Sequence, residues 1–165
     1  MSGRRSAGIL LFRRGAFSVE VLLGHSGGPY WAGRDTGAWS VPKGEYGEDE
    51  DALAAARREF TEELGLPVPA GPLVPLGEVV QKNSKRVTVW ALEADLDPST
   101  ITPGTFRLEW PPRSGRMQQF PEIDRMAWFG LEDAGRRLIA GQQPMLDRLA
   151  EVAGDLHRAT RPDSP

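Results

Sequence analysis

The sequence predicts a single α+β domain in which helices cover a mixed β-sheet. Apolar runs of strand length lie on both sides of one strong helix, and a second amphipathic helix closes the chain. Strands and helices do not alternate regularly, as they do around a parallel sheet. The length of 165 residues fits one domain with a substantial core. We therefore expect a domain over residues 1–156 and a flexible tail over residues 157–165.

Two apolar runs near the amino terminus predict a pair of strands. They are SAGILLFRR at residues 6–14 and SVEVLLGH at residues 18–25, and the short segment GAF separates them. Both have strand length and are rich in aliphatic residues. The glycine-rich stretch at residues 26–38 then predicts irregular structure, either a connector or a loop that contacts a ligand.

One strong helix is predicted after the short extended segment WSVPKG at residues 39–44. The helix begins within the acidic run EDED at residues 48–51, where negative charge complements the helix dipole. At its other end, Gly65 is placed to form a left-handed cap. Pro67 prevents the helix from continuing.

The second half of the chain predicts three more strands and a closing helix. The strands are LGEVVQK at residues 76–82, RVTVWALEA at residues 86–94 and DRMAWFG at residues 124–130. An amphipathic pattern over residues 143–156 predicts a helix that begins near Pro144.

The composition excludes several classes of function. The chain contains no cysteine, which removes disulfides, zinc–thiolate sites and thiol nucleophiles. This is compatible with a reducing cytoplasm, where we expect the protein to act as a monomer or homodimer. A net charge of -3 gives no reason to expect duplex nucleic acid as a partner. No apolar run approaches the roughly 20 residues that a bilayer span needs, so we expect no membrane contact.

The predicted helix gathers three acids, Glu59, Glu62 and Glu63, within about 100° of arc. An apolar stripe that includes Phe60 lies beside them, so the acids border the core. Arg58 can pair with Glu62, but Glu59 and Glu63 lack a cation within the helix. A hard divalent ion such as Mg²⁺ takes carboxylate oxygens as ligands and would satisfy them. A solvated acidic helix face is the alternative.

The residues around these acids resemble a known motif. From Gly44 the chain continues with five residues, Glu50, seven residues and then REFTEELGL at residues 58–66. Residues 44–66 resemble the Nudix box, the loop–helix motif of the MutT-like Nudix hydrolases, and every defined position matches. The box covers about a seventh of the chain. The resemblance implies an α/β/α sandwich around a mixed central sheet.

The resemblance also implies a divalent-metal site and a reaction. Mg²⁺ or Mn²⁺ would be bound by Glu59, Glu62, Glu63 and the carbonyl of Gly44. Arg58 would hold the glutamates in position through a salt bridge. The reaction implied is hydrolysis of a nucleoside diphosphate linked to another moiety, by attack of water on phosphorus.

The acid that accepts the proton of this water is a box glutamate or an acid from a later loop. The later candidates are Glu109 in RLEWPP and Glu122 in FPEIDRMAWF. We favour Glu122, because its position resembles the corresponding region of many relatives. The segment over residues 109–129 also resembles a bacterial subgroup of predicted nucleoside triphosphate pyrophosphohydrolases.

Substrate contacts must come from outside the box. WSVPKG resembles the W-x-x-P-K-G pattern of Nudix enzymes that cleave dinucleoside polyphosphates or diphosphoinositol polyphosphates, and it places Lys43 to meet a phosphate. The basic segments QKNSKR and PPRSGRMQQ could clamp a polyphosphate tail, although ordinary exposed positions are the alternative. An aromatic side chain in a glycine-rich loop can stack on a base. The further candidates are therefore Lys82, Arg113, Arg116 and Trp31.

We expect a small nucleotide as the substrate. Dinucleoside polyphosphates come first, and ordinary or oxidised nucleoside triphosphates come second. A diphosphoinositol polyphosphate would favour a more basic pocket than the sequence provides. The alternative to an enzyme is a catalytically silent nucleotide-sensing module, whose usual mark would be a damaged box, and this box is intact.

Overall fold

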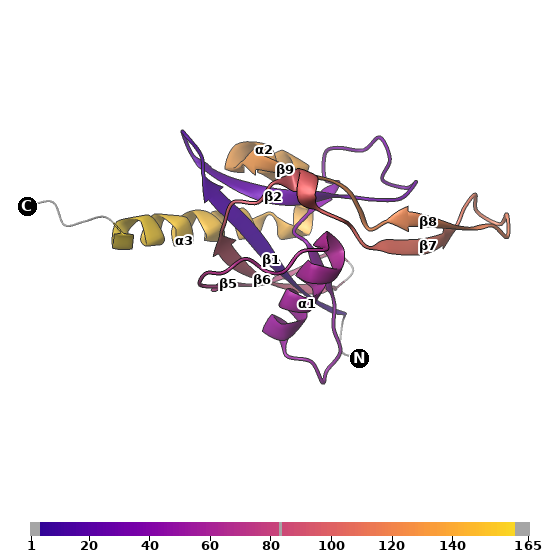
Figure 1. Cartoon of the computed structure of the whole chain (residues 1–165), viewed down its shortest axis with the longest axis horizontal. Helices are drawn as coiled ribbons and strands as arrows, with labels where there is room; N and C mark the ends of the chain where they lie inside the picture. The colour runs from indigo at the N-terminus through magenta and orange to yellow at the C-terminus, as the bar shows by residue number, and fades with distance from the viewer. Residues whose placement is uncertain (1–3, 83, 161–165) are drawn as a thin grey trace, which may run out of the picture.

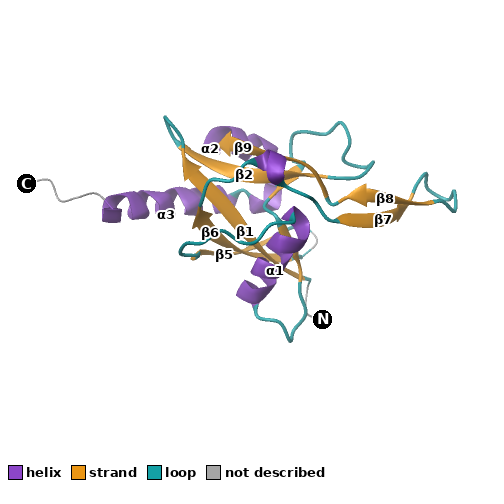
Figure 2. Ribbon diagram, in the orientation of Figure 1, coloured by secondary structure: helices purple, strands orange, loops and turns teal. Residues whose placement is uncertain are grey.

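The structure is a computed structural model that describes residues 4–82 and 84–160. A central β-sheet separates helix α1 from helices α2 and α3, and a two-stranded hairpin projects from one end (Figure 1). Figure 2 shows the same arrangement by type of element. The helices are α1 (Ala52–Leu64), α2 (Leu131–Arg137) and α3 (Pro144–Thr160), with 3₁₀ turns η1 (Pro98–Thr100) and η2 (Ala140–Gln142).

The main sheet contains seven strands within the described part of the chain. They are β1 (Arg5–Arg14), β2 (Val19–Ser26), β3 (Trp39–Ser40), β4 (Lys43–Glu45), β5 (Val74–Val80), β6 (Arg86–Glu93) and β9 (Ile123–Gly130). The order is β3-β2-β1-β6-β5, with β4 also paired to β1 and β9 to β2. β1 and β6 are parallel and the other pairs are antiparallel, so the prediction of a mixed sheet is confirmed.

The alternation of side chains along β1 divides the core into two layers. Ile9 and Leu11 belong to the cluster that contains Phe60 of α1. Leu10 and Phe12 belong to the opposite cluster, which α2 and α3 cover. All five side chains are almost completely buried. Since successive residues of a strand face opposite sides of a sheet, one apolar run supplies both layers of the α/β/α sandwich.

Helix α1 begins and ends where the local sequence predicts. The carboxylate of Asp51 accepts a hydrogen bond from the Ala54 N–H at 3.1 Å, which caps the first turn. Gly65 follows the last residue with a φ of 69°. A side chain at Gly65 would also lie 2.6 Å from the carbonyl oxygen of Thr102, so glycine fits this position for two reasons.

The structure adds elements that the sequence did not predict. The hairpin of β7 (Thr105–Glu109) and β8 (Met117–Pro121) and the short helix α2 are the main ones. The segment WSVPKG forms two short strands, β3 and β4, in place of one extended piece. The closing helix begins at Pro144 as expected and continues to Thr160, which is beyond its predicted end. The rest of the expected tail, residues 161–165, lies outside the described residues.

None of the helices in the described part of the chain combines the length and the apolar character that crossing a membrane requires.

Candidate active site

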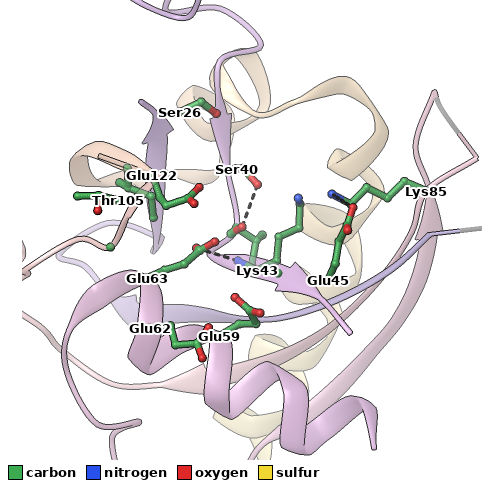
Figure 3. A pocket seen from close by; sticks show the side chains of 15 residues that line it. Ser26, Ser40, Lys43, Glu45, Glu59, Glu62, Glu63, Lys85, Thr105 and Glu122 are labelled. Carbon is green, nitrogen blue, oxygen red and sulfur yellow. Dashed lines mark hydrogen bonds and ion pairs between the residues drawn. The ribbon is translucent and has the colours of Figure 1, made fainter. Parts of the chain in front are cut away.

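A cleft of about 580 Å³ opens beside the amino-terminal side of the hairpin and the carboxyl-terminal half of α1. Five glutamates line it, namely Glu45, Glu59, Glu62, Glu63 and Glu122. Two lysines, Lys43 and Lys85, complete its charged lining. Figure 3 shows the three glutamates of α1 on one side of the cleft and Glu122 on another. The cleft therefore brings together residues from four distant parts of the chain.

Glu63 lies in the least solvated part of this acidic wall. Its Oε2 accepts a hydrogen bond from the Lys43 N–H at 3.1 Å. Burial raises the pKa of the Glu63 carboxyl to about 8, the nearby Lys43 ammonium opposes this effect, and Glu59 and Glu122 add to it. The fold therefore holds a carboxyl group where its own ionisation is unfavourable without additional positive charge.

The two lysines face this wall from the ends of β4 and β6. Burial, together with the adjacent Lys85 ammonium, lowers the pKa of Lys43 to about 8. Lys85 lies 3.7 Å from the carboxylate of Glu45, and 23% of its side chain is exposed. Two ammonium groups placed side by side in a partly buried cleft repel each other, and a bound anion would relieve that repulsion.

Arg58 organises the acids on the solvent side of the cleft. Its Nε and Nη2 donate to the two carboxylate oxygens of Glu50, both at 2.8 Å. Its Nη1 donates to Glu59 at 2.8 Å and to Glu62 at 3.1 Å. The hydrogen bonds to Glu50 are the main reason that the pKa of Arg58 lies above its ordinary value. Arg58 thus links the loop before the helix to two acids on the helix.

Gly44 allows Glu59 to reach the cleft. A Cβ atom at position 44 would overlap the carboxylate of Glu59, so only glycine leaves room for it. Burial raises the pKa of Glu59, whereas the hydrogen bond from Arg58 lowers it. The close approach of Glu59 to the backbone at Gly44 places a carboxylate and a peptide carbonyl in one small region.

The residues of the cleft fit a hard divalent cation by their chemistry. Within residues 4–82 and 84–160, no three His, Cys, Asp or Glu side chains already converge as a preformed metal site. Glu62 accepts a hydrogen bond from Arg58 and is 57% exposed. Glu63 instead accepts one from the Lys43 N–H, which a dashed line marks in Figure 3. The candidate ligands are nonetheless all oxygen atoms, and burial raises the pKa of Glu59 and Glu63, so added positive charge would favour their ionised forms. These are the donors that Mg²⁺ and Mn²⁺ prefer.

The structure brings only some of the predicted site residues into the cleft. Lys43, Gly44, Glu59, Glu62, Glu63 and Glu122 all line it. Arg58 contacts the lining acids from outside. Glu109 lies at the far end of β7 and does not line the cleft.

Four predicted substrate contacts lie away from the cleft lining. Trp31 packs against the hydrophobic cluster beneath α2 and α3, which explains its position in the loop. Lys82 is exposed in the turn between β5 and β6. Arg113 and Arg116 lie in the exposed turn between β7 and β8. Lys85, which shares the basic segment with Lys82, is the residue that lines the cleft.

Sequence reasoning named Lys85 only as part of the basic segment QKNSKR and chose Lys82 from it, and it did not select Ser26, Ser40 or Thr105. The sequence signal for Lys85 was its place in the basic segment QKNSKR, while its approach to Lys43 depends on β6 running parallel to β1, which also pairs with the strand that carries Lys43. For the three hydroxyl residues the sequence contains no comparable signal, since their positions depend on long-range strand pairing.

Two partly buried glutamates, a supporting arginine and a pair of lysines thus gather at one end of the α/β/α sandwich. A protein-family model described as the NUDIX domain matches residues 3–149. The chain therefore belongs to the Nudix family, and its fold is that of the Nudix pyrophosphohydrolases. No curated protein sequence matches it.

Several solved structures share this fold. A C. elegans Ap4A hydrolase in a binary complex superposes with a TM-score of 0.65 at 21% identity, covering 91% of this chain and 98% of that chain. A mutT/nudix family protein from Listeria innocua has a TM-score of 0.63 at 16% identity, covering 97% and 100%. The NUDIX domain of Shewanella oneidensis NrtR, complexed with ADP ribose, has a TM-score of 0.61 at 15% identity, covering 93% and 90%. At these identities the likeness concerns the fold.

Proposed function

We propose that this chain is a divalent-metal-dependent hydrolase that cleaves a phosphoanhydride bond in a nucleoside diphosphate linked to another moiety. The observation that carries this proposal is the position of Glu63. Its carboxyl is buried enough to raise its pKa to about 8, and it faces a pair of lysines across a cleft large enough for a nucleotide. Acids beside lysines suit a ligand assembly that contains both a cation and phosphates.

Mg²⁺ or Mn²⁺ is the proposed cofactor, held by Glu59, Glu62, Glu63 and the carbonyl of Gly44. When bound, the ion supplies positive charge that neutralises phosphoryl oxygens and acidifies water. Arg58 keeps Glu59 and Glu62 within the cleft through the contacts at 2.8 and 3.1 Å. Its contribution is therefore to position the acids.

Lys43 and Lys85 are the proposed contacts for phosphate oxygens. Both side chains line the cleft, and each ammonium group lowers the cost of bringing a polyanion next to five carboxylates. Lys82, Trp31, Arg113 and Arg116 were expected to contact substrate as well. Because they lie away from the cleft lining, the proposal rests on the two lysines.

Glu122 is the proposed acceptor of the proton from the attacking water. It comes from the segment between β8 and β9, is exposed to solvent, and faces the acids of α1 across the cleft (Figure 3). An accessible carboxylate on the wall opposite the metal-binding acids can take a proton from water without competing for the same oxygen atoms.

Dinucleoside polyphosphates are the preferred substrates, and nucleoside triphosphates come second. The volume of about 580 Å³ accommodates one nucleotide, and the fold is shared with an Ap4A hydrolase. Diphosphoinositol polyphosphates fit less well, because five glutamates and two lysines make the cleft acidic. We place the activity in the domain over residues 1–156, as a cytoplasmic monomer or homodimer.

A substrate panel tests this proposal. The purified protein is incubated with diadenosine polyphosphates, nucleoside triphosphates, nucleoside diphosphate sugars and inositol pyrophosphates, in Mg²⁺ and separately in a chelator. We expect turnover of the dinucleoside or nucleoside polyphosphates that is lost in the chelator, and water labelled with heavy oxygen identifies the phosphorus attacked. Absence of turnover throughout the panel, with nucleotide binding retained, would favour a silent sensing module instead.

A further inference from the structure

The hairpin formed by β7 and β8 continues the wall of the cleft. Thr105, the first residue of β7, lines the cleft, and so do Glu122 and Ile123, which directly follow β8. From there the two strands extend away from the main sheet (Figure 1). A ligand that leaves the cleft on this side would therefore lie along the hairpin.

One face of the hairpin is attached to the body of the protein. Phe106 and Phe120 lie opposite each other in the register, and a Cβ atom at Gly28 would touch the Phe106 ring. At the far end, Tyr30 and Trp110 form an edge-to-face ring pair with centroids 5.2 Å apart. The loop at residues 26–38 thus supports this face along its length.

The other face is open, and it starts at the cleft. By strand alternation Arg107 and Glu109 share the face of Thr105, and the register places Gln119 opposite Arg107. The Nε2 of Gln119 donates to Oγ1 of Thr105 at 2.7 Å, which fits this assignment of faces. The open face is therefore a strip that is continuous with the cleft, polar except for Pro121 and Met117 on β8.

Arg107 is the cation of this strip. It lies two residues beyond Thr105, or about 7 Å along the strand. It is exposed, and within the described residues its guanidinium has no hydrogen bond or ion pair with a protein group. An exposed arginine on a rigid strand offers planar, two-point recognition of a phosphate.

We propose that the open face of the hairpin is a second subsite, in which Arg107 binds a phosphate of the substrate half that extends beyond the cleft. This subsite rests on the proposed function, because the cleft must hold the reacting part of the same nucleotide. Continuity with the cleft and the unpaired positive charge argue for an anionic occupant. A dinucleoside polyphosphate is long enough to use both subsites, whereas a nucleoside triphosphate ends within the cleft.

The Arg107→Ala variant tests this subsite by the steady-state kinetics of two substrates. We expect the KM for diadenosine tetraphosphate to rise about tenfold with kcat near that of the wild type, since the contact is made equally before and during reaction. The kinetic constants for ATP should change by less than about twofold. Arg107→Lys should recover part of the loss. Arg136→Ala, which removes another exposed arginine on α2, outside the cleft lining, is the control and should match the wild type.

A binding measurement separates this proposal from the proposed function. A non-hydrolysable diadenosine tetraphosphate analogue is titrated calorimetrically into the wild type and into both alanine variants. If the wild type binds the analogue without hydrolysing any substrate, weaker binding by Arg107→Ala still supports the subsite while the proposed function fails. If Arg107→Ala behaves as Arg136→Ala does in both kinetics and binding, the subsite is overturned and the proposed function stands. Failure of the wild type to bind the analogue would overturn the subsite, whereas turnover of nucleoside triphosphates in the substrate panel would leave the proposed function standing.

Discussion

Replacing Glu63 by glutamine should make the metal-free protein more stable and the enzyme much less active. The amide keeps an oxygen that can accept the hydrogen bond from the Lys43 N–H. It removes the negative charge that burial makes unfavourable. The amide is a poorer ligand for Mg²⁺ than the carboxylate, so activity should fall. Stability without the metal and activity should therefore change in opposite directions.

The magnitude follows from the pKa of the Glu63 carboxyl. A rise from 4.5 to about 8 corresponds to roughly 5 kcal/mol at a pH above 8, and access of water to the cleft reduces this to a few kcal/mol. The glutamine amide also adds N–H donors that the carboxylate lacks, and a donor left without a hydrogen-bond partner in the cleft reduces the gain in stability. We expect a net gain of roughly 1–2 kcal/mol, or about 5 °C in the midpoint of thermal unfolding for a chain of this size.

The assay is thermal unfolding at about pH 9 in a chelator and again with added Mg²⁺, together with the rate of substrate hydrolysis. At that pH Lys43, whose pKa is about 8, is mostly neutral. Removing the negative charge of Glu63 therefore takes little electrostatic stabilisation away from Lys43. Glu63→Gln should be more stable than the wild type in the chelator, gain less from Mg²⁺, and lose roughly 100-fold or more in rate. Glu132→Gln, an exposed change on α2, should alter none of these quantities.

The reasoning would be refuted if Glu63→Gln unfolded at a lower temperature than the wild type in the chelator. Such a result would mean that the ionised carboxylate stabilises the fold. Equal stabilisation of both proteins by Mg²⁺ would instead show that Glu63 is not a ligand of the ion.

Three further predictions concern the same site. Gly44→Ala should displace the Glu59 carboxylate and lower kcat by roughly 10- to 100-fold with little change in unfolding temperature, as kinetics and calorimetry would show. Arg58→Lys keeps the charge but loses the two-point contact with Glu50, so the Mg²⁺ concentration for half-maximal rate should rise about tenfold. In a chelator the free energy of unfolding should fall as the pH rises from about 5 to 8, because the folded state keeps a proton on Glu63 that the unfolded state has lost. Urea titrations across this range measure it, and a flat profile would contradict the burial of this acid.

The helix that carries the acids could be predicted because its determinants are local. Asp51 caps the first turn and Gly65 closes the last one, and each needs only its immediate neighbours to act. The spacing of Glu59 and Glu63 beside the apolar stripe follows from the same helix geometry. The acidic face of the helix could therefore be anticipated without knowledge of the tertiary structure.

The hairpin could not be predicted with the same ease. TFRLE at residues 105–109 alternates polar and apolar residues, but the pattern is only five residues long and its partner MQQFP contains a proline. The hairpin gains much of its support from the loop at residues 26–38, which is distant in sequence. Elements that depend on such non-local packing carry weak local signals.

The sequence led to Lys82 in place of Lys85 as the basic residue of the cleft for a related reason. Lys82 and Lys85 are three positions apart, and composition treats them alike. Strand β6 begins directly after Lys85, and its pairing with β1 carries Lys85 toward the cleft, whereas Lys82 remains in the turn. Register within the sheet, which single-sequence patterns leave open, decides which lysine lines the cleft.

The buried acid and the packing of its helix depend on each other. Phe60 and Leu64, on either side of Glu63 in the helix, are completely buried, and removing two such side chains from water contributes roughly 4–6 kcal/mol. This is comparable to or larger than the few kcal/mol that an ionised Glu63 costs in the absence of a cation. The helix therefore cannot rotate to expose Glu63 without losing more than it gains. The acid therefore stays in the cleft, where the folded state keeps its proton below about pH 8 and a bound cation would favour its ionised form.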